Sequence, residues 1–354
     1  MAAGNFVINV FRQDAFSGLT LTEMVEKKPY VPDTLGKLNI FEDDPIVTTD
    51  VQIESEQRIL SLVKTTPRGA PIEQRTTEKR AARYFRCPRL AKETTIYANE
   101  LQNVRRESEE VTLKDLASEV AIRLTGPSGL TMQLEYTEEF HRLGAVQGIL
   151  LDSDGSTLFN WYNEFGIAQP AEIAFNLAAN TAGTLIPICN TVRRGMKRAG
   201  QGAFLEGRTE VHALCGDSFF DVFTQHPDVI RTYQNWAAVV GGTADGAPEL
   251  RRAREFETFF FGGIYWHNYR GSDDNSTIAI PPTKVKFFPV NAPGVFRRAL
   301  APAEGFSEIN QRGRPIYIFR NIDPSEEVKW VQFTAKKYPL HICTRPEMLQ
   351  RGTA

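Results

Sequence analysis

Residues 128–151 read SGLTMQLEYTEEFHRLGAVQGILL, the longest periodic segment of the chain. Their apolar residues recur at a spacing that averages one helical turn, which predicts an amphipathic helix with one face in a core. The residues of that face are Met132, Tyr136, Phe140, Leu143, Val146 and Leu150. Ser128 is the expected N-cap, and the turn residues at 152–156 are expected to end the helix. Such a helix is typical of α+β domains and indicates no activity by itself.

The opposite face of this helix is expected to be polar. It carries Glu135, Glu138 and Glu139. Arg142 follows Glu138 by one turn, so the two are expected to form a helix-stabilising ion pair. His141 is expected to be a surface residue, because a lone histidine rarely belongs to a catalytic constellation.

The composition is that of an ordinary globular protein, with 42% hydrophobic and 24% charged residues among 354. A formal net charge of −2 gives no global sign of nucleic-acid binding. No apolar run approaches the length of a membrane span, and the N-terminus lacks a signal-peptide pattern. We therefore expect a protein that is soluble and intracellular when made, without a membrane partner.

The cysteines indicate neither a disulfide framework nor a zinc site, because they are far apart and form no CxxC pair. They are Cys87, Cys189, Cys215 and Cys343. We expect four reduced, isolated thiols.

The first part of the chain contains two segments without a core of their own. Residues 1–45 predict an arm, because two short apolar pieces are separated by polar residues and prolines. Residues 46–97 predict a long β-hairpin that is too polar to be stable without another surface. Between Lys64 and Lys92, nine basic residues outnumber two acidic ones, for a formal charge of +7.

The rest of the chain predicts a mixed α/β arrangement. Helices are expected at 112–125, 182–199, 218–223 and 229–236. Strands are expected at 158–162, 211–214, twice within 255–269, and at 284–290, 316–319, 328–337 and 340–343. A cationic cluster in the last turns of the second of these helices is expected to complement the helix dipole. The cluster consists of Arg193, Arg194, Lys197 and Arg198.

The search for catalytic and binding motifs is negative. The sequence after Gly216 is not a nucleophile elbow, because Phe220 stands where glycine is required. Asp152 and Asp154 could hold a metal, but two carboxylates in a turn are more often turn formers. We therefore expect no catalytic residue, no cofactor, no metal site and no enzymatic activity.

One alternative stays open, since catalytic groups can converge only in space. In a soluble α+β enzyme of hydrolase type, Asp217 and Ser218 would meet His212 or His226.

Several segments resemble the major capsid proteins of tailed bacteriophages, in particular the lambda-type group (the phage capsid protein E family). They are the long helix with LLDSDG at 150–155, the run KFFPVNAPGVFRRAL at 286–300, WVQFTA at 330–335 and PEML at 346–349. The order of elements agrees over nearly the whole chain. The resemblance implies an α+β structure with the Hong Kong 97-like phage capsid fold, and a shell-forming role without catalysis.

The resemblance also implies a division of the chain. It gives an N-terminal arm (1–45), an extended loop that reaches over a neighbouring subunit (46–97), a peripheral domain with the spine helix (98–162), an axial domain (163–325) with strands returning to the peripheral domain near 255–300, and C-terminal strands (326–354).

By the same resemblance, copies of this chain form hexamers and pentamers of an icosahedral shell around packaged double-stranded DNA, which the inner surface contacts non-specifically. No long helical segment precedes the arm, so a separate scaffolding protein is expected, together with a portal. A decoration protein is an open alternative. The expected location is the virion capsid, after synthesis in the host cytoplasm.

The charge pattern adds a hypothesis about the contact between subunits. From Glu107 to Glu139, eight acidic residues outnumber two basic ones, for a formal charge of −6. Because the extended loop of related capsids lies across the adjacent peripheral domain, the basic hairpin is expected to dock on this acidic region. Simple solvation of both charge sets is an equal alternative. The predicted contact residues are Lys64, Arg68, Arg75, Lys79, Arg80, Arg83 and Arg86, and Glu135, Glu138 and Glu139.

Overall fold

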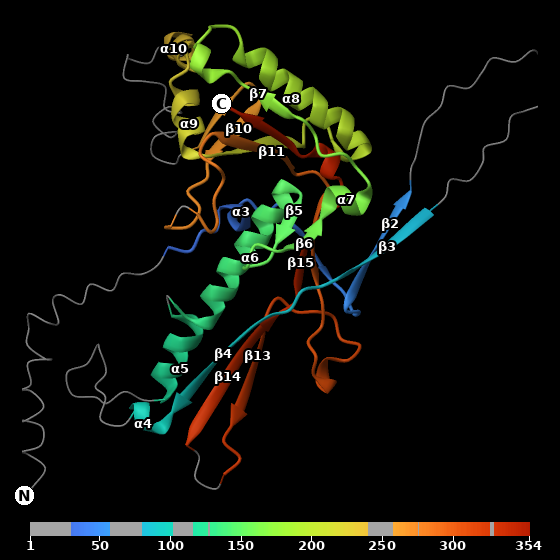
Figure 1. Cartoon of the computed structure of the whole chain (residues 1–354), viewed down its shortest axis with the longest axis vertical. Helices are drawn as coiled ribbons and strands as arrows, with labels where there is room; N and C mark the ends of the chain where they lie inside the picture. The colour runs from blue at the N-terminus through green and yellow to red at the C-terminus, as the bar shows by residue number, and fades with distance from the viewer. Residues whose placement is uncertain are drawn as a thin grey trace, which may run out of the picture.

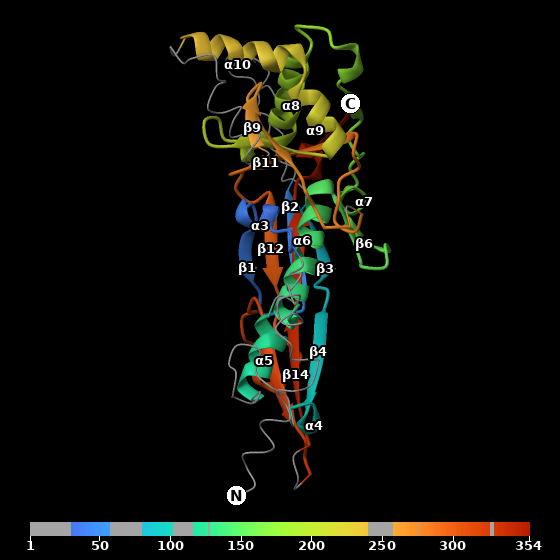
Figure 2. The same ribbon diagram turned by 90° about the vertical axis from the view of Figure 1, so that its left-hand side faces the viewer.

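The structure is a computed structural model that describes residues 30–56, 80–101, 116–126, 128–239, 258–274, 276–325 and 329–354. Figure 1 shows an upper domain (within 172–290 and 346–354) and a lower domain (within 30–165 and 296–343). Turned by 90°, the molecule is narrow, and one domain lies above the other (Figure 2). Helices and sheets occur in both domains, so the predicted α+β class is confirmed.

The long predicted helix is α6 (Leu130–Gln147), which runs diagonally through the lower domain (Figure 1). It begins after Gly129, and no side chain caps its N-terminus, so the predicted Ser128 cap is wrong. It ends at Gly148, whose φ of 82° lets the backbone N–H bond back to the last turn. A Cβ at position 148 would lie 2.4 Å from Cε2 of Tyr162, so backbone and space both require glycine.

The segment after the helix is a short hairpin. β5 (Ile149–Leu151) pairs antiparallel with β6 (Thr157–Asn160). Asp154 Oδ1 accepts the backbone N–H of Ser156 at 2.8 Å, so this carboxylate shapes the predicted turn. No group of three or more possible metal ligands occurs among the described residues.

The predicted apolar face of α6 is buried only in its C-terminal half. Leu143 and Val146 are 3% and 1% exposed, whereas Met132 and Tyr136 remain partly exposed. On another side of the helix, residues outside the predicted face are buried instead. The smaller core cluster there consists of Leu130, Leu134 and Ala335.

A six-stranded mixed sheet in the order β7-β16-β11-β8-β10-β9 forms the centre of the upper domain. Its strands are β7 (Glu172–Ala174), β8 (Glu210–Cys215), β9 (Thr258–Phe261), β10 (Ile264–Asn268), β11 (Lys284–Val290) and β16 (Gln350–Thr353). The helices beside it are α8 (Leu185–Gly200), α9 (Asp217–Thr224) and α10 (Pro227–Val239). Aromatic rings fix α9 on this sheet: Phe223 stacks on Trp266 at 4.1 Å, and Trp266 meets Phe287 at 5.5 Å.

The lower domain contains two three-stranded sheets, β13-β14-β4 and β1-β12-β15, and the antiparallel pair β2-β3. Their strands are β1 (Glu42–Pro45), β2 (Asp50–Glu56), β3 (Arg80–Arg86), β4 (Leu90–Tyr97), β12 (Phe296–Leu300), β13 (Tyr317–Ile322), β14 (Trp330–Lys337) and β15 (Pro339–Cys343). The short helices are α3 (Thr34–Lys37), α4 (Ala98–Leu101), α5 (Leu116–Thr125) and α7 (Trp161–Phe165). β14, β15 and β16 follow one another in the chain but belong to three different sheets.

Most other predicted elements are confirmed with shifts of a few residues. The strand predicted at 284–290 is β11, and the two strands predicted within 255–269 are β9 and β10. The run predicted at 158–162 is extended only as far as Asn160, because the Asn160 side chain accepts the backbone N–H of Tyr162 at 3.1 Å and starts α7. Positions 112–115 of the predicted shorter helix lie outside the described residues.

The hairpin occupies less of the 46–97 segment than predicted. β2 and β3 pair with each other, but β4 pairs with β14 and is part of the lower domain. Within the described ranges, no helix is both long and apolar enough to cross a membrane.

Candidate functional site: a buried charge junction and a projecting hairpin

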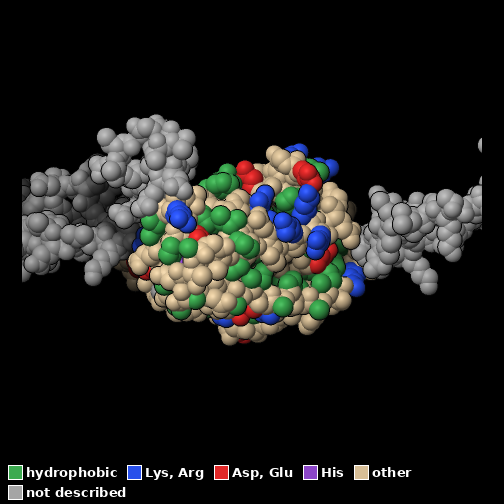
Figure 3. Space-filling model, turned by 90° about the horizontal axis from the view of Figure 1, so that it is seen from above, with side chains coloured by type: hydrophobic (Ala, Val, Ile, Leu, Met, Phe, Trp, Pro, Cys, Tyr) green, Lys and Arg blue, Asp and Glu red, His purple; other side chains and the backbone are tan. Residues whose placement is uncertain are grey.

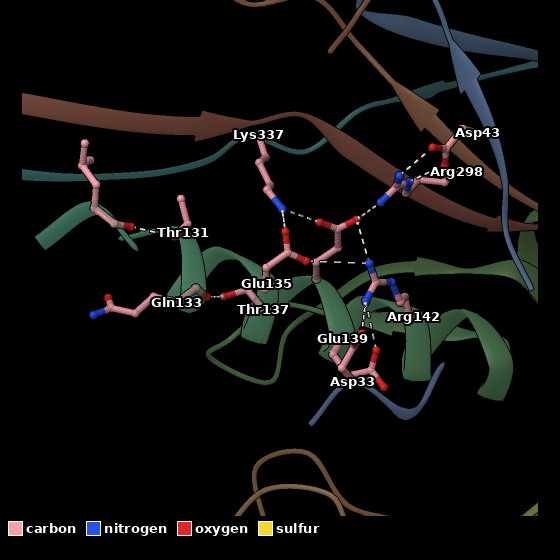
Figure 4. Close-up of polar contacts among 12 residues, drawn as sticks. Asp33, Asp43, Thr131, Gln133, Glu135, Thr137, Glu139, Arg142, Arg298 and Lys337 are labelled. Atoms are coloured by element: carbon pink, nitrogen blue, oxygen red, sulfur yellow. Dashed lines mark hydrogen bonds and ion pairs between the residues drawn. The ribbon is translucent and has the colours of Figure 1, made fainter. Parts of the chain in front are cut away.

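The charged side of α6 meets two strands in the interior of the lower domain (Figure 4). Glu138 lies at the centre and is 2% exposed. Arg298 Nη1 of β12 donates to Glu138 Oε1 at 2.7 Å, and Lys337 Nζ of β14 donates to Oε2 at 2.8 Å. Arg142 Nη2 lies 3.4 Å from Oε1, which confirms the predicted ion pair within the helix. One carboxylate therefore connects α6 with two strands.

Glu139 joins the helix to the segment before β1. It is fully buried, and its Oε1 accepts the backbone N–H of Leu35 in α3 at 2.9 Å. Arg142 Nη1 donates to Glu139 Oε2 at 3.2 Å and to Asp33 Oδ1 at 3.3 Å. Residues 33–35, within the predicted arm, are thus held against α6.

Arg298 also holds β1 in place. Its Nε and Nη2 donate to the two carboxylate oxygens of Asp43 at 2.7 Å each, a bidentate pair. Asp43 and Arg298 are also partners in the parallel pairing of β1 with β12. Backbone and side-chain contacts therefore select the same register.

The charge junction, meaning these contacts of Glu138 and Glu139, keeps Glu138 charged in spite of burial. Burial alone raises the pKa of Glu138, but the ammonium of Lys337 beside it outweighs this effect and holds the pKa well below its usual range. At Glu139 burial prevails, and its pKa is raised. Removal of one partner from such a site leaves an uncompensated buried charge, so the junction acts as a clamp on the segments that it joins.

The expectation that the glutamates lie on an outer face is wrong for two of the three. Glu138 and Glu139 are buried, whereas the Glu135 side chain is 45% exposed and pairs with Lys337. The physical reason is that β12 and β14 bring Arg298 and Lys337 over this face. The periodicity of one helix contains no information about that cover.

The predicted surface position of His141 is also wrong. His141 and His341 are 1% and 0% exposed, and no ring nitrogen of either has a hydrogen-bond partner among the described residues. His341 Nε2 lies 3.6 Å from Glu138 Oε1, too far for a hydrogen bond. Burial, with a contribution from His341, lowers the pKa of His141 to about 4. Burial lowers the pKa of His341 as well, so both rings are neutral at pH 7.

The β2–β3 hairpin is the second candidate site. It leaves the body of the molecule on one edge, the right-hand edge in Figure 1. Phe85 anchors its base, with ring centroids 5.3 Å from Trp161 and 5.9 Å from Phe159. Tyr84, on the opposite face of the strand, is 68% exposed. The hairpin is thus attached by one face and offers the other to its surroundings.

The structure describes only some of the predicted basic contact residues. Arg86 is exposed on β3, and the guanidinium of Arg83 lies 5.5 Å from the centre of the Phe165 ring in the same subunit. Arg80 pairs with Glu56 through the backbone, at the outermost described rung of the hairpin. The others lie outside the described residues: Lys64, Arg68, Arg75 and Lys79.

The residues of the hydrolase alternative do not form a catalytic arrangement. His212 Nδ1 lies 2.8 Å from His267 Nε2, and His226 lies 4.0 Å from Asp228. Ser218 is exposed in the first turn of α9, and no hydrogen bond joins it to either histidine in the part of the chain that the structure describes.

The cationic cluster of α8 lies on the surface of the upper domain. Figure 3 shows Lys and Arg side chains gathered on the side where α8 lies, beside apolar side chains. Arg193, Arg194 and Lys197 line a polar pocket of about 580 Å³ together with Glu206 and Glu210. These cations lie in the C-terminal half of α8, where positive charge interacts favourably with the helix dipole, as predicted.

The partners of the glutamates were not predicted from the sequence. Asp33 and Asp43 lie in the predicted arm, and Arg298 and Lys337 lie in late strands. A signal existed for Lys337, because strand alternation places it on the same face as Ala335, which is fully buried. A lysine on an apolar strand face indicates a buried acidic partner.

The sequence model of a family described as phage major capsid protein E matches residues 19–354. The major capsid protein of Pseudomonas phage KPP10 is 24% identical over 356 residues, with 97% of this chain and 98% of that protein covered. The major capsid protein of Salmonella phage Felix O1 (isolate Felix O1-VT1) is 23% identical, with 93% and 94% covered.

Solved structures show the same fold at lower identity. The capsid subunit of a native GTA particle is 12% identical, with a TM-score of 0.52 and with 97% of this chain and 99% of that chain covered. The capsid subunit of cyanophage P-SCSP1u is 11% identical, with a TM-score of 0.51 and with 89% and 86% covered. Both likenesses span the upper and the lower domain.

Proposed function

Because this chain belongs to the phage major capsid protein E family and is a structural subunit of an icosahedral capsid shell, we propose that its hairpin joins neighbouring subunits. The predicted function and the predicted Hong Kong 97-like fold are confirmed. Shell formation is self-association, and the protein is a component of the virion capsid. The absence of catalytic activity remains part of the proposal.

The observation that supports the hairpin contact is its position clear of the body (Figure 1). A two-stranded ribbon is marginally stable in isolation, so a neighbouring subunit supplies the surface that it lacks. The basic residues of segment 64–86 are the proposed contacts, with Arg86 and Tyr84 as the exposed residues at its described base.

The acidic side of this contact differs from the first hypothesis. Glu138 and Glu139 are engaged inside their own subunit, so docking on them would break the charge junction. We keep Glu135, which is half-exposed, and the acidic residues between 107 and 119 as the proposed docking region.

The upper domain is the proposed contact around the centres of hexamers and pentamers. Exposed apolar side chains support this role, because such residues in assembling proteins mark interfaces. Those of the upper domain are Ile186, Leu205, Val222, Ile230 and Phe260, between 37% and 47% exposed.

Further partners are proposed from the family resemblance. They are a separate scaffolding protein, a portal, a decoration protein as an option, and packaged DNA held without sequence preference. Before assembly the subunit would reside in the host cytoplasm.

The test is charge reversal of Lys79, Arg80 and Arg86 to Glu. Arg83 is left unchanged because its Nη1 atom is buried in its own subunit. The variant subunit should keep its unfolding midpoint but fail to form closed shells in negative-stain electron microscopy at low salt, where such contacts are least screened.

A matched control keeps the charge, with Lys79→Arg, Arg80→Lys and Arg86→Lys, and should assemble normally. Adding Glu135→Lys to the reversed variant should restore part of the assembly. Normal shells from the reversed variant at low salt would refute the hairpin contact.

A further inference from the structure

We propose that Phe306 is an apolar knob that inserts into a groove on α6 of a neighbouring subunit. This inference rests on the proposed function, in which identical subunits meet edge to edge. It names a second contact, separate from the hairpin, together with the surface that receives it.

The knob lies in the loop between β12 and β13. A short 3-10 helix, η4 (Phe306–Glu308), forms its tip. Phe306 is 95% exposed and Ile309 is 57% exposed, the two largest values among the exposed apolar side chains of the lower domain apart from Tyr84. A single exposed apolar residue is ordinary, but an aromatic side chain at the tip of a protruding loop is typical of an interface anchor.

The stem of this loop is held firmly. Gly313 donates its backbone N–H to the carbonyl of Ile46 at 2.9 Å. Glu304 lies 3.3 Å from Arg89 and 3.5 Å from Lys336. A knob on a fixed stem loses little conformational entropy when it is buried, which favours association.

The groove lies along the N-terminal half of α6 and has a volume of about 570 Å³. Met132 and Tyr136, one helical turn apart, line it together with Val31 and Asp273. These two residues belong to the apolar face that the sequence predicts to be buried, yet they remain partly exposed in the subunit. An apolar side chain from another subunit would complete that burial.

The positions of knob and groove fit a ring of identical subunits. In Figure 1 the knob loop lies on the right-hand side below the hairpin. The segment before α3 and the loop after β10, which contribute Val31 and Asp273 to the groove, lie on the left-hand side of α6. In a closed ring, one edge of each subunit meets the opposite edge of the next. The knob therefore shares its edge with the hairpin, and both would contact the same neighbour.

Charged side chains of both signs lie near knob and groove. The knob loop carries the exposed Arg312 and Arg314 together with Glu304. The groove is lined by Asp273 and Asp274 together with Lys92. Opposite charges on the two sides would set the register of the contact and suppress wrong pairings.

The test is chemical cross-linking of assembled shells that carry Ser307→Cys, next to the intact Phe306, and Gln133→Cys. All four native cysteines are free and buried, so the new thiols are the accessible ones. A short bismaleimide should join the two positions between subunits and give covalent dimers and higher multimers on denaturing gels. Each single-cysteine variant should remain monomeric.

A matched pair, Ser307→Cys with Asn321→Cys, places the second thiol on exposed β13, away from the groove, and should not cross-link. Shells of the Ser307→Cys, Gln133→Cys protein that yield no multimers would overturn the proposal while leaving the hairpin contact intact.

The side chain itself is tested with Phe306→Ala. The unfolding midpoint of the subunit should not change, because the ring is 95% exposed. The protein concentration needed for assembly should rise by about tenfold, the usual effect of losing an interface anchor. Ile322→Ala, a 41% exposed apolar residue outside the groove and the knob, is the control and should assemble at the wild-type concentration. Equal assembly of Phe306→Ala and wild type would contradict the inference.

Discussion

Glu138 is a buried carboxylate that is shared by Arg298, Lys337 and Arg142. We predict that Glu138→Gln lowers the free energy of unfolding by about 3 kcal/mol, because it leaves buried cations without their counter-charge. Urea denaturation of the unassembled subunit measures this change. Glu135→Gln is the control and should lower the free energy of unfolding by less than about 1 kcal/mol, since the Glu135 side chain is 45% exposed. Equal effects of the two substitutions would show that burial of Glu138 has no energetic consequence.

His141 makes the subunit sensitive to acid. Its pKa is about 4 in the folded state against an ordinary value of 6.5, so between these values the unfolded chain binds more protons. Stability due to neutral His141 is therefore present at pH 7 and is lost as the pH falls. We predict that, between pH 7 and pH 5, the free energy of unfolding of His141→Phe falls by about 2 kcal/mol less than that of wild type. Urea denaturation at the two pH values measures this difference.

The buried pair His212 and His267 provides an internal reference for that measurement. Burial lowers their pKa values to about 4 and about 3, so they contribute acid sensitivity of the same sign in both proteins. Identical pH dependence of wild type and His141→Phe would contradict the assignment to His141.

At the scale of elements, Gly148 decides where α6 ends. We predict that Gly148→Ala destabilises the subunit by about 2–3 kcal/mol, because the residue has a positive φ and a Cβ would strike Tyr162. Gly155→Ala is a matched control with the same φ of 82° and nothing within 4 Å, and should cost about 1 kcal/mol. Thermal unfolding of both variants separates the steric effect from the backbone effect.

Two adjacent aromatic residues of the hairpin are expected to differ in their effects on stability and on assembly. Phe85→Ala should lower the free energy of unfolding by about 3–4 kcal/mol, since its ring is buried against Trp161. Tyr84→Ala should change it by less than about 0.5 kcal/mol but reduce the yield of shells. Denaturation of subunits and electron microscopy of assembled material measure the two effects. Loss of stability in Tyr84→Ala would mean that the hairpin packs on its own subunit by both faces.

Local chemistry explains which elements the sequence predicts well. β11 agrees at both ends because its apolar run ends at a turn with Asn291 at a positive φ. α6 ends earlier than predicted because Gly148 adopts a left-handed conformation in the middle of an apolar run. The sequence 144–151 contains that glycine, but apolar periodicity continues across it and hides the stop.

At the scale of the whole molecule, the four cysteines are predicted to stay reduced in the shell. All are free and buried, and burial raises the pKa of Cys87 and of Cys189 to about 12. Mass spectrometry after alkylation without reductant should show no modified thiol in native shells and four in denatured protein. A disulfide between subunits would contradict this prediction.

Most of the longer helices and strands among the described residues could be predicted, but the charge junction could not. Glu138 contacts residues 160 and 199 positions away, and apolar periodicity carries no information on contacts at such separations. The charge of the hairpin was visible in the sequence, whereas the partners of the helix glutamates required the topology. Strands that pack on the charged side of a helix bury that side, although the sequence of the helix looks amphipathic.

The distribution of β14, β15 and β16 over three sheets has a consequence for synthesis. The six-stranded sheet and both three-stranded sheets each lack a strand until residues 330–353 have been translated. Many multidomain chains fold one domain at a time as they leave the ribosome, beginning at the N-terminus. This chain has to fold after residue 353 has emerged from the ribosome. A polypeptide interrupted before residue 330 therefore lacks a strand in each of these three sheets and completes neither domain.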